Sequence, residues 1–143
     1  MKTALVTGAS RGIGAAIAQQ LLNDGFKVYG TATSEPGALA ITEMLKPQDV
    51  GASDSEDIAG KGLVLRLGED DTEQQIVDLI KAIGPVDVLV HNASINIDNL
   101  ILRLKSDDWR KVLDVSLTSF YLLSKACVRG MVKKRYGRII GIS

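Results

Sequence analysis

The sequence has very little cysteine and histidine, the residues that most often build disulfides and metal sites. Its 143 residues contain one cysteine, Cys127, and one histidine, His91, far apart along the chain. A single cysteine cannot form an internal disulfide, and this pair does not make a metal-ligand cluster. We therefore expect no metal, and the unpaired cysteine fits a reducing cytoplasm.

The chain also lacks an excess of either charge. Seventeen basic side chains balance 17 acidic ones, so the formal net charge is +0. This balance offers no electrostatic reason to bind nucleic acid or an anionic membrane. No apolar run approaches the length of a membrane span, and the first residues lack a signal-peptide core. We therefore expect neither nucleic acid nor a membrane as a partner.

What the chain does contain is enough apolar residues for a core. Hydrophobic residues make up 45% and charged residues 24%, which excludes a disordered tail. A folded domain of this size buries roughly two thirds of its unfolded surface. The length predicts a single domain over residues 1–143.

Short apolar runs alternate with helical periodicity along the chain. The runs predict buried strands at 3–7, 27–31, 63–67, 86–90 and 138–142. Helices are predicted at 12–23, 36–45, 72–83 and 107–135. This alternation predicts an α/β fold with a doubly wound, Rossmann-type parallel sheet. The polar stretch 46–61 reads as a surface loop.

Local signals predict the helix ends. Ser34 is the expected N-cap of the second helix, with Pro36 in its first turn, and Thr72 is the expected N-cap of the third. Gly137 is expected to end the long helix after a basic last turn. The apolar residues of that helix fall on one stripe, formed by Trp109, Val112, Leu113, Leu117, Phe120, Leu123, Cys127 and Met131.

The sharpest motif is TGASRGIG at residues 7–14, between a predicted strand and a predicted helix. In such a turn Gly8 permits the tight bend, Gly12 lets the backbone approach a diphosphate, and Gly14 permits close helix packing. The helix N-terminus adds N–H groups and partial positive charge. The predicted cofactor-binding residues here are Gly8, Ser10, Arg11, Gly12, Ile13 and Gly14.

This turn matches in full the signature of the short-chain dehydrogenase/reductase family, which the chain resembles along its whole length. LVHNAS at 89–94 and RYGRIIGIS at 135–143 continue the resemblance. VYGTATSEPGA, DNLILRLKSDDW and LLSKACVRGMVKKRYGRII resemble the 3-oxoacyl-[acyl-carrier-protein] reductases most closely. The resemblance implies strand order 3-2-1-4-5, incomplete at the C-terminal side. It also implies NADPH-dependent reduction of 3-oxoacyl to 3-hydroxyacyl thioesters in fatty-acid biosynthesis.

The residues after the second strand favour NADP(H) over NAD(H). NAD selectivity usually needs an acid there to hold the ribose 2′-hydroxyl, but none occurs before Glu35. Arg11 can reach a 2′-phosphate, and Thr33 can add a hydroxyl hydrogen bond. Arg11 as a solvated surface arginine remains the alternative.

The resemblance implies further cofactor residues. Asn92 and Ala93 match the family's Asn-Asn-Ala-Gly and would line the nicotinamide-side ribose. His91 and Ser94 depart from that pattern. His91 is expected to serve as a structural hydrogen-bonding group, and the Ser94 side chain to crowd the cofactor.

The end of the third predicted strand carries Arg66 and Leu67, where the resembled reductases meet the adenine ring. Arg66 can stack on adenine or remain solvated, and both alternatives stay open.

Family catalysis uses Asn, Ser, Tyr and Lys to position a carbonyl and give it a proton. Ser116 occupies the asparagine position, with helix packing as its alternative role. The family's catalytic serine aligns just after Ser143. The one Tyr-x-x-x-Lys match, Tyr121 to Lys125, lies in the long helix and reads as a surface pair. We therefore expect these 143 residues alone to be inactive.

The resemblance also implies partners. The 107–135 helix is the family's usual subunit-pairing helix, which predicts a homodimer or homotetramer. Arg135 matches a basic position that docks acyl carrier protein, and helix-end capping is its alternative role. The rival functions are a non-catalytic dinucleotide-binding or interaction protein and another short-chain alcohol or sugar dehydrogenase.

Overall fold

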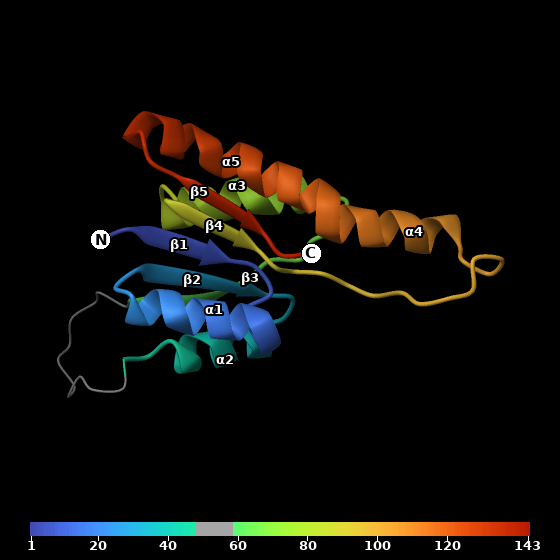
Figure 1. Ribbon diagram of the computed structural model, residues 1–143, viewed down its shortest axis with the longest axis horizontal. Coiled ribbons are helices and arrows are strands. Elements are labelled where there is room, and N and C mark those ends of the chain that lie inside the picture. The colour runs from blue at the N-terminus through green and yellow to red at the C-terminus, as the bar shows by residue number, and fades with distance from the viewer. Residues whose placement is uncertain (48–58) are drawn as a thin grey trace.

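The computed structural model describes residues 1–47 and 59–143, which form a parallel sheet flanked by helices (Figure 1). The strands are β1 (Thr3–Val6), β2 (Lys27–Ala32), β3 (Gly60–Val64), β4 (Val88–His91) and β5 (Arg138–Gly141). They form one five-stranded sheet in the order β3-β2-β1-β4-β5, which confirms the predicted fold class and strand order. Most of the predicted surface loop 46–61 lies outside the described residues.

Helices cover both faces of the sheet (Figure 1). α1 (Gly12–Asn23) and α2 (Glu35–Met44) pack on one face, where Ala18 and Ile41 join a buried cluster with Val28 and Val90. α3 (Thr72–Ile83) and α5 (Ser119–Lys134) pack on the other. The second cluster contains Leu5, Leu65, Ile76, Leu79, Val86, Leu89, Leu123, Cys127 and Met131.

The predicted position of the third strand is wrong by three residues. The prediction followed the apolar run 63–67, but β3 begins at Gly60, where it pairs with Val28 of β2. Backbone pairing with β2 defines this strand. Its first three residues are Gly60, Lys61 and Gly62, so the apolar pattern did not reveal where it begins. Leu65 remains buried just beyond the strand, and its N–H donates to the Ala32 carbonyl at 2.9 Å.

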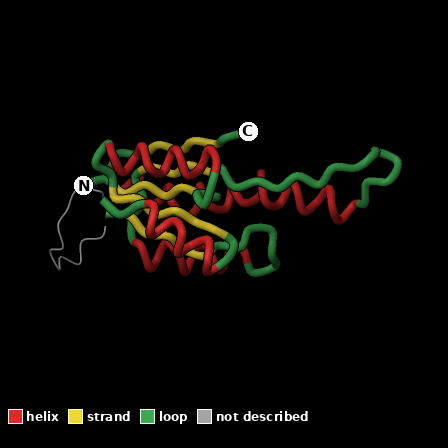
Figure 2. The backbone as a smooth tube through the Cα atoms, turned by 90° about the horizontal axis from the view of Figure 1, so that it is seen from below, coloured by secondary structure: helices red, strands yellow, loops and turns green. Residues whose placement is uncertain are grey.

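The predicted long helix is not a single α-helix. α4 (Ser106–Leu113) and α5 are joined by a π-helical segment, η1 (Asp114–Thr118). The predicted apolar stripe is buried only within α5, whereas α4 has no buried residue and Trp109 is 57% exposed. The reason is position, because α4 and the connection from β4 project beyond the sheet (Figures 1 and 2).

The helix ends follow the predicted signals in part. Ser34 caps α2 as predicted, its Oγ accepting a hydrogen bond from the Gly37 N–H at 3.2 Å. Thr72 is not an N-cap; it is the first residue of α3, and its hydroxyl donates to the Glu69 carbonyl at 2.7 Å. α5 ends at Lys134, one residue from the predicted helix end at 135, but its C-cap is Arg135, in the left-handed conformation with φ 56°, and not the predicted Gly137.

Candidate cofactor-binding site

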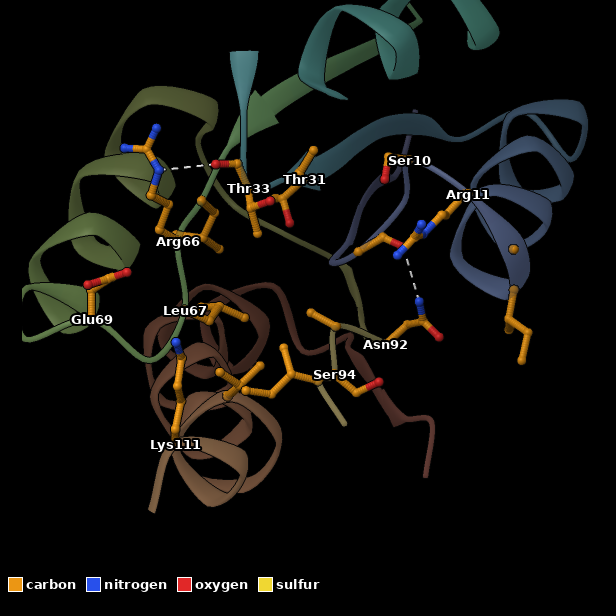
Figure 3. A pocket seen from close by; sticks show the side chains of 18 residues that line it. Ser10, Arg11, Thr31, Thr33, Arg66, Leu67, Glu69, Asn92, Ser94 and Lys111 are labelled. Carbon is orange, nitrogen blue, oxygen red and sulfur yellow. Dashed lines mark hydrogen bonds between the residues drawn. The ribbon is translucent and has the colours of Figure 1, made fainter. Parts of the chain in front are cut away.

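A cavity of about 760 Å³ opens beside the C-terminal ends of the central strands (Figure 3). In open parallel sheets this is the edge where ligands bind, at the point where the strand order reverses. The volume lies in the range of small-molecule and cofactor sites. The predicted residues that line it are Gly8, Ser10, Arg11, Gly12, Ile13, Thr33, Arg66, Leu67, Asn92, Ala93 and Ser94.

The glycine turn forms the wall of the cavity nearest α1. Gly8 and Gly12 adopt left-handed φ angles of 65° and 59°, which glycine accepts at little cost. The Ala9 N–H donates to the Thr31 carbonyl at 2.9 Å and thereby holds the turn against β2. A side chain on Gly12 would meet no atom within 4 Å, so the backbone here faces open space. The Arg11 side chain makes no cap hydrogen bond, which leaves the first-turn N–H groups of α1 for an anion.

Gly14 plays the predicted packing role and is absent from the cavity wall. A Cβ at this position would lie 2.1 Å from the Gly8 carbonyl oxygen and 2.6 Å from Asn92 Nδ2. Asn92 Nδ2 in turn donates to that Gly8 oxygen at 3.1 Å, which is one of the dashed lines in Figure 3. The close approach of α1, the turn and the end of β4 therefore depends on glycine at this position.

The cavity carries more positive than negative side chains. Arg11, Arg66 and Lys111 line it together with one acid, Glu69. None of the three cations makes an ion pair with another residue of the described ranges 1–47 and 59–143. This charge balance, together with the helix N-terminus, suits a ligand with several phosphates.

Arg66 is held at the end of β2. Its Nε donates to the Thr33 carbonyl at 3.0 Å, as Figure 3 shows. Gln75 fixes the Arg66 backbone from both sides, since its Oε1 accepts from the N–H at 2.9 Å and its Nε2 donates to the carbonyl at 3.2 Å. The guanidinium therefore lies beside the segment predicted to recognise the adenosine ribose.

The end of β4 is tied to β1 through Thr7. The Thr7 hydroxyl oxygen accepts hydrogen bonds from the N–H groups of Asn92 and Ala93, both at 3.0 Å. It also lies 2.9 Å from Nδ1 of His91, whose Nε2 lies 3.1 Å from the Ser116 carbonyl oxygen. His91 thus makes the structural hydrogen bonds expected of it, and the backbone at Asn92 and Ala93 is fixed.

Neither the one catalytic candidate, Ser116, nor the formal Tyr-x-x-x-Lys match belongs to the cavity lining. Ser116 lies in η1 and does not line the cavity, although its neighbour Val115 does. Tyr121 is 60% exposed, and Lys125 pairs with Glu73 at 3.9 Å. Tyr121 and Lys125 also lie outside the cavity lining, so this formal motif has the geometry of a surface pair.

Sequence reasoning missed several residues of the cavity. Thr31 could have been found, because it lies at the C-terminal end of β2, two positions before the predicted Thr33. Lys111 and Val115 carried no sequence signal, since only the path of α4 and η1 brings them to the cavity. The missed lining residues are Thr31, Ala32, Leu65, Glu69, Ile95, Lys111 and Val115.

Outside this cavity, the described residues offer neither a reactive thiol nor a metal site nor a membrane-spanning helix. Burial raises the pKa of the Cys127 thiol to about 12, so it stays protonated at neutral pH. In the described part of the chain no group of three His, Cys, Asp or Glu side chains could hold a metal. Within the same residues, no helix has the length and apolar character to cross a membrane.

A parallel sheet in this order, with a glycine turn and a cavity at its switch point, defines a Rossmann-type nucleotide-binding α/β protein. The family model for short chain dehydrogenases matches residues 2–143. The chain belongs to this short-chain dehydrogenase family.

Similar proteins narrow the resemblance. The 3-oxoacyl-[acyl-carrier-protein] reductase FabG of Escherichia coli K12 is 49% identical over 142 residues, covering 99% of this chain and 54% of the relative. FabG of Haemophilus influenzae is 46% identical over the same shares. The chain therefore spans about half the length of the curated relatives it matches.

Solved structures agree with the fold. A 3-oxoacyl-(acyl-carrier-protein) reductase from Agrobacterium tumefaciens C58, solved with NADP bound, superposes with a TM-score of 0.80 at 31% identity. The match covers 99% of this chain and 52% of that one. The TT0495 protein from Thermus thermophilus gives a TM-score of 0.76 at 31% identity, over 97% and 54% of the two chains.

Proposed function

We propose that residues 1–143 are the NADP(H)-binding domain of a reductase that converts 3-oxoacyl-[acyl-carrier-protein] to the 3-hydroxyacyl form in fatty-acid biosynthesis. The observation that carries this proposal is the cavity, which combines the glycine turn, the N-terminus of α1 and two arginines. The 49% identity to a 3-oxoacyl-[acyl-carrier-protein] reductase supports the substrate class.

Each part of the cavity suits one part of the cofactor. The α1 N-terminus and the backbone at Gly12 would hold the diphosphate. Arg11 and Thr33 would hold the 2′-phosphate, because a phosphate needs a cation and neutral donors. Arg66 and Leu67 would border the adenine. When bound, NADPH supplies the hydride for carbonyl reduction.

At the other end of the cofactor, Asn92 and Ala93 would hold the nicotinamide-side ribose. Their backbone is fixed by Thr7, with both N–H donors 3.0 Å from its hydroxyl oxygen. The Ser94 side chain lies in the cavity lining and would narrow the space beside that ribose. The position is therefore expected to tune how tightly the cofactor fits.

Cofactor selectivity gives the direct test. Fluorescence titration of the full chain should show tighter binding of NADPH than of NADH. Arg11→Ala should weaken NADPH binding by about tenfold, because a charge-assisted phosphate contact is lost, and leave NADH unchanged. Arg129→Ala, on the exposed side of α5 and away from the cavity, is the matched control. Equal affinity of the unaltered chain for both cofactors would contradict the proposal.

We further propose that the 143 residues bind the cofactor without turning over substrate. Family catalysis needs a serine and a Tyr-x-x-x-Lys at the cavity, whereas Ser116, Tyr121 and Lys125 do not line it. NADPH oxidation with a 3-oxoacyl thioester should stay at the level of a protein-free control. Clear turnover would show that another residue supplies the proton.

Within the described residues the cavity lining contains no tyrosine, which also favours the second candidate, a dinucleotide-binding protein without catalysis. Both candidates predict NADPH binding. A coding sequence that continues into a serine and a Tyr-x-x-x-Lys would favour the reductase, and turnover of simple alcohols or sugars would favour another short-chain dehydrogenase.

The partner proposals rest on the exposed surface. α5 exposes Tyr121, Val128 and Val132, and α4 exposes Trp109, so these helices are the proposed surface of a homodimer or homotetramer. Arg135, exposed at the end of α5, is the proposed contact for acyl carrier protein. Sedimentation of the full chain should show a species of twice or four times the monomer mass. A cytoplasmic location remains a prediction.

A further inference from the structure

We propose that His91 is a positioning residue that joins the cofactor-binding end of β4 to the π-helical segment η1 as a fixed Nε2–H tautomer. The bridge runs from the backbone of Asn92 and Ala93, through Thr7 and the imidazole, to the Ser116 carbonyl. Its effect on cofactor binding rests on the proposed function, whereas the tautomer and the bridge do not.

The tautomer follows from counting donors and acceptors at Thr7. A hydroxyl has one proton to donate and two lone pairs. The N–H groups of Asn92 and Ala93 occupy both lone pairs, each at 3.0 Å from Oγ1. The Thr7 proton is therefore directed at His91 Nδ1, 2.9 Å away, which must accept. The ring proton then resides on Nε2 and is donated to the Ser116 oxygen at 3.1 Å.

The surroundings hold the ring in one orientation. His91 is only 3% exposed and stacks on Phe120 of α5, with ring centroids 5.5 Å apart and planes 10° from parallel. From the end of β4, the ring therefore contacts Thr7 just after β1, the backbone of η1 and Phe120 of α5. A 180° flip would place ring carbons where both hydrogen-bond partners now find nitrogens.

The π-helical segment η1, at the other end of the bridge, has backbone carbonyls that take hydrogen bonds from side chains. A π-helical stretch departs from the regular α-helical ladder, so its carbonyls can take other donors. The Asp114 carbonyl accepts from the Ser119 hydroxyl at 2.6 Å, and the Ser116 carbonyl accepts from His91. Val115, between them, lines the same cavity as the glycine turn. The bridge thus connects Asn92 and Ala93 to η1, two parts of the chain that both line the cavity.

A second proton on the ring would break this bridge at Nδ1, because a donor would then face the Thr7 hydroxyl. Among the described residues, the groups that face the ring are uncharged: Thr7 just after β1, the backbone of Val115 and Ser116 in η1, and Phe120 of α5. Burial lowers the pKa of His91 below its ordinary value, although the backbone carbonyls of η1 partly oppose the shift. The bridge is therefore intact at neutral pH and is lost as the solution becomes acidic.

The experiment compares His91→Leu, which removes both polar contacts, with His91→Asn, whose amide has an acceptor and a donor. Leu79→Ala in the core is the matched control for lost stability, because Leu79 is buried on α3 away from the cavity. Nitrogen-15 NMR of the full chain should show a protonated Nε2 and an unprotonated Nδ1. A protonated Nδ1 at neutral pH would overturn the proposal.

The NADPH dissociation constant should rise about tenfold in His91→Leu, stay within about threefold in His91→Asn, and not change in Leu79→Ala. Amide hydrogen exchange at Asn92 and Ala93 should accelerate, and the amide signals of η1 should shift, in His91→Leu alone. If NADPH does not bind the unaltered chain, the proposed function fails, while the NMR and exchange data still decide the bridge. If His91→Leu and Leu79→Ala showed the same amide exchange rates at Asn92 and Ala93 and the same η1 amide signals, the bridge would be refuted.

Discussion

β1 and β5 belong to the same sheet, yet their burial is opposite. Ala4, Leu5 and Val6 of β1 are fully buried, whereas every residue of β5 is exposed, including Ile139 and Ile140. Both strands are apolar, so composition does not explain the difference. β1 lies between two strands and two helical layers, while β5 is an edge strand. Burial therefore follows the number of neighbours that an element has on the sheet.

The same contrast separates binding groups from catalytic groups. All the residues predicted to bind the cofactor except Gly14 line one cavity at the C-terminal ends of the central strands. Ser116, the residue at the family's catalytic asparagine position, lies on η1 and does not line that cavity. Small side-chain changes in the central region should therefore strongly alter the free energy of unfolding or the NADPH affinity. Changes in the projecting region should alter both only weakly.

The largest contrast is expected at two glycines of the turn. Gly14→Ala would place a Cβ 2.1 Å from the Gly8 oxygen, so it should lower the free energy of unfolding by about 3 kcal/mol and abolish NADPH binding. Gly12→Ala meets no atom within 4 Å and should cost only the left-handed backbone strain, about 1 kcal/mol. Urea unfolding of both variants measures the difference. Equal losses would mean that the turn tolerates no side chain for reasons other than packing.

Leucines from the two regions test the packing directly. Leu89 of β4 is fully buried, so Leu89→Ala should cost about 3 kcal/mol of unfolding free energy. Leu102 lies in the projecting connection and is 95% exposed. Leu102→Ala should therefore change the unfolding free energy by less than about 0.5 kcal/mol. The measurement is thermal and urea unfolding at several protein concentrations. A large, concentration-dependent loss for Leu102→Ala would show that the projection is buried between subunits.

Asp87 directly precedes β4, so it tests the stability of the sheet at the end away from the cavity. Burial alone would raise its pKa, but the Thr3 N–H at 2.8 Å and the Lys134 ammonium at 2.9 Å together lower it. Because the folded pKa lies below the unfolded one, the carboxylate stabilises the fold at neutral pH. That stability should be lost as the pH falls below about 4 toward the folded pKa.

Asp87→Asn should therefore reduce stability by about 2 kcal/mol at pH 7 and weaken its dependence on acid. Asp107→Asn, which alters the exposed pair with Arg110, should change neither. Urea unfolding over about pH 3 to 7, which includes the acid range where the Asp87 carboxylate is protonated, checks both variants. An unchanged acid limb in Asp87→Asn would assign the pH dependence to other carboxylates.

The smallest effect is expected at the end of α5. Arg135 adopts a left-handed conformation that glycine accepts more easily, so Arg135→Gly should raise the unfolding free energy by about 0.5 kcal/mol. Affinity for NADPH should stay the same, because Arg135 lies outside the cavity lining. The same variant measures the proposed contact with acyl carrier protein. A loss of stability would show that the guanidinium makes a compensating contact.

Much of the fold could be predicted because its signals are local. The strand–helix alternation, the Ser34 cap and the glycine turn each depend on a few adjacent residues. The position of β3 could not, because pairing with β2 over Gly60–Val64 decides it against the apolar pattern. The end of the long helix near residue 135 was also predicted, but the residue that caps it was not, since Arg135 rather than Gly137 adopts the left-handed conformation typical of glycine.

The sequence by itself determined the family, the sheet order through that family, and the glycine turn at the cavity, since all three are encoded in contiguous motifs. Only the tertiary structure decided that Lys111 and Val115 reach the cavity and that His91 joins Thr7 to the Ser116 carbonyl. These contacts join residues distant in sequence, and their geometry depends on the path of η1. Hydrogen bonds and packing across elements are set by three-dimensional proximity, which residue spacing does not encode.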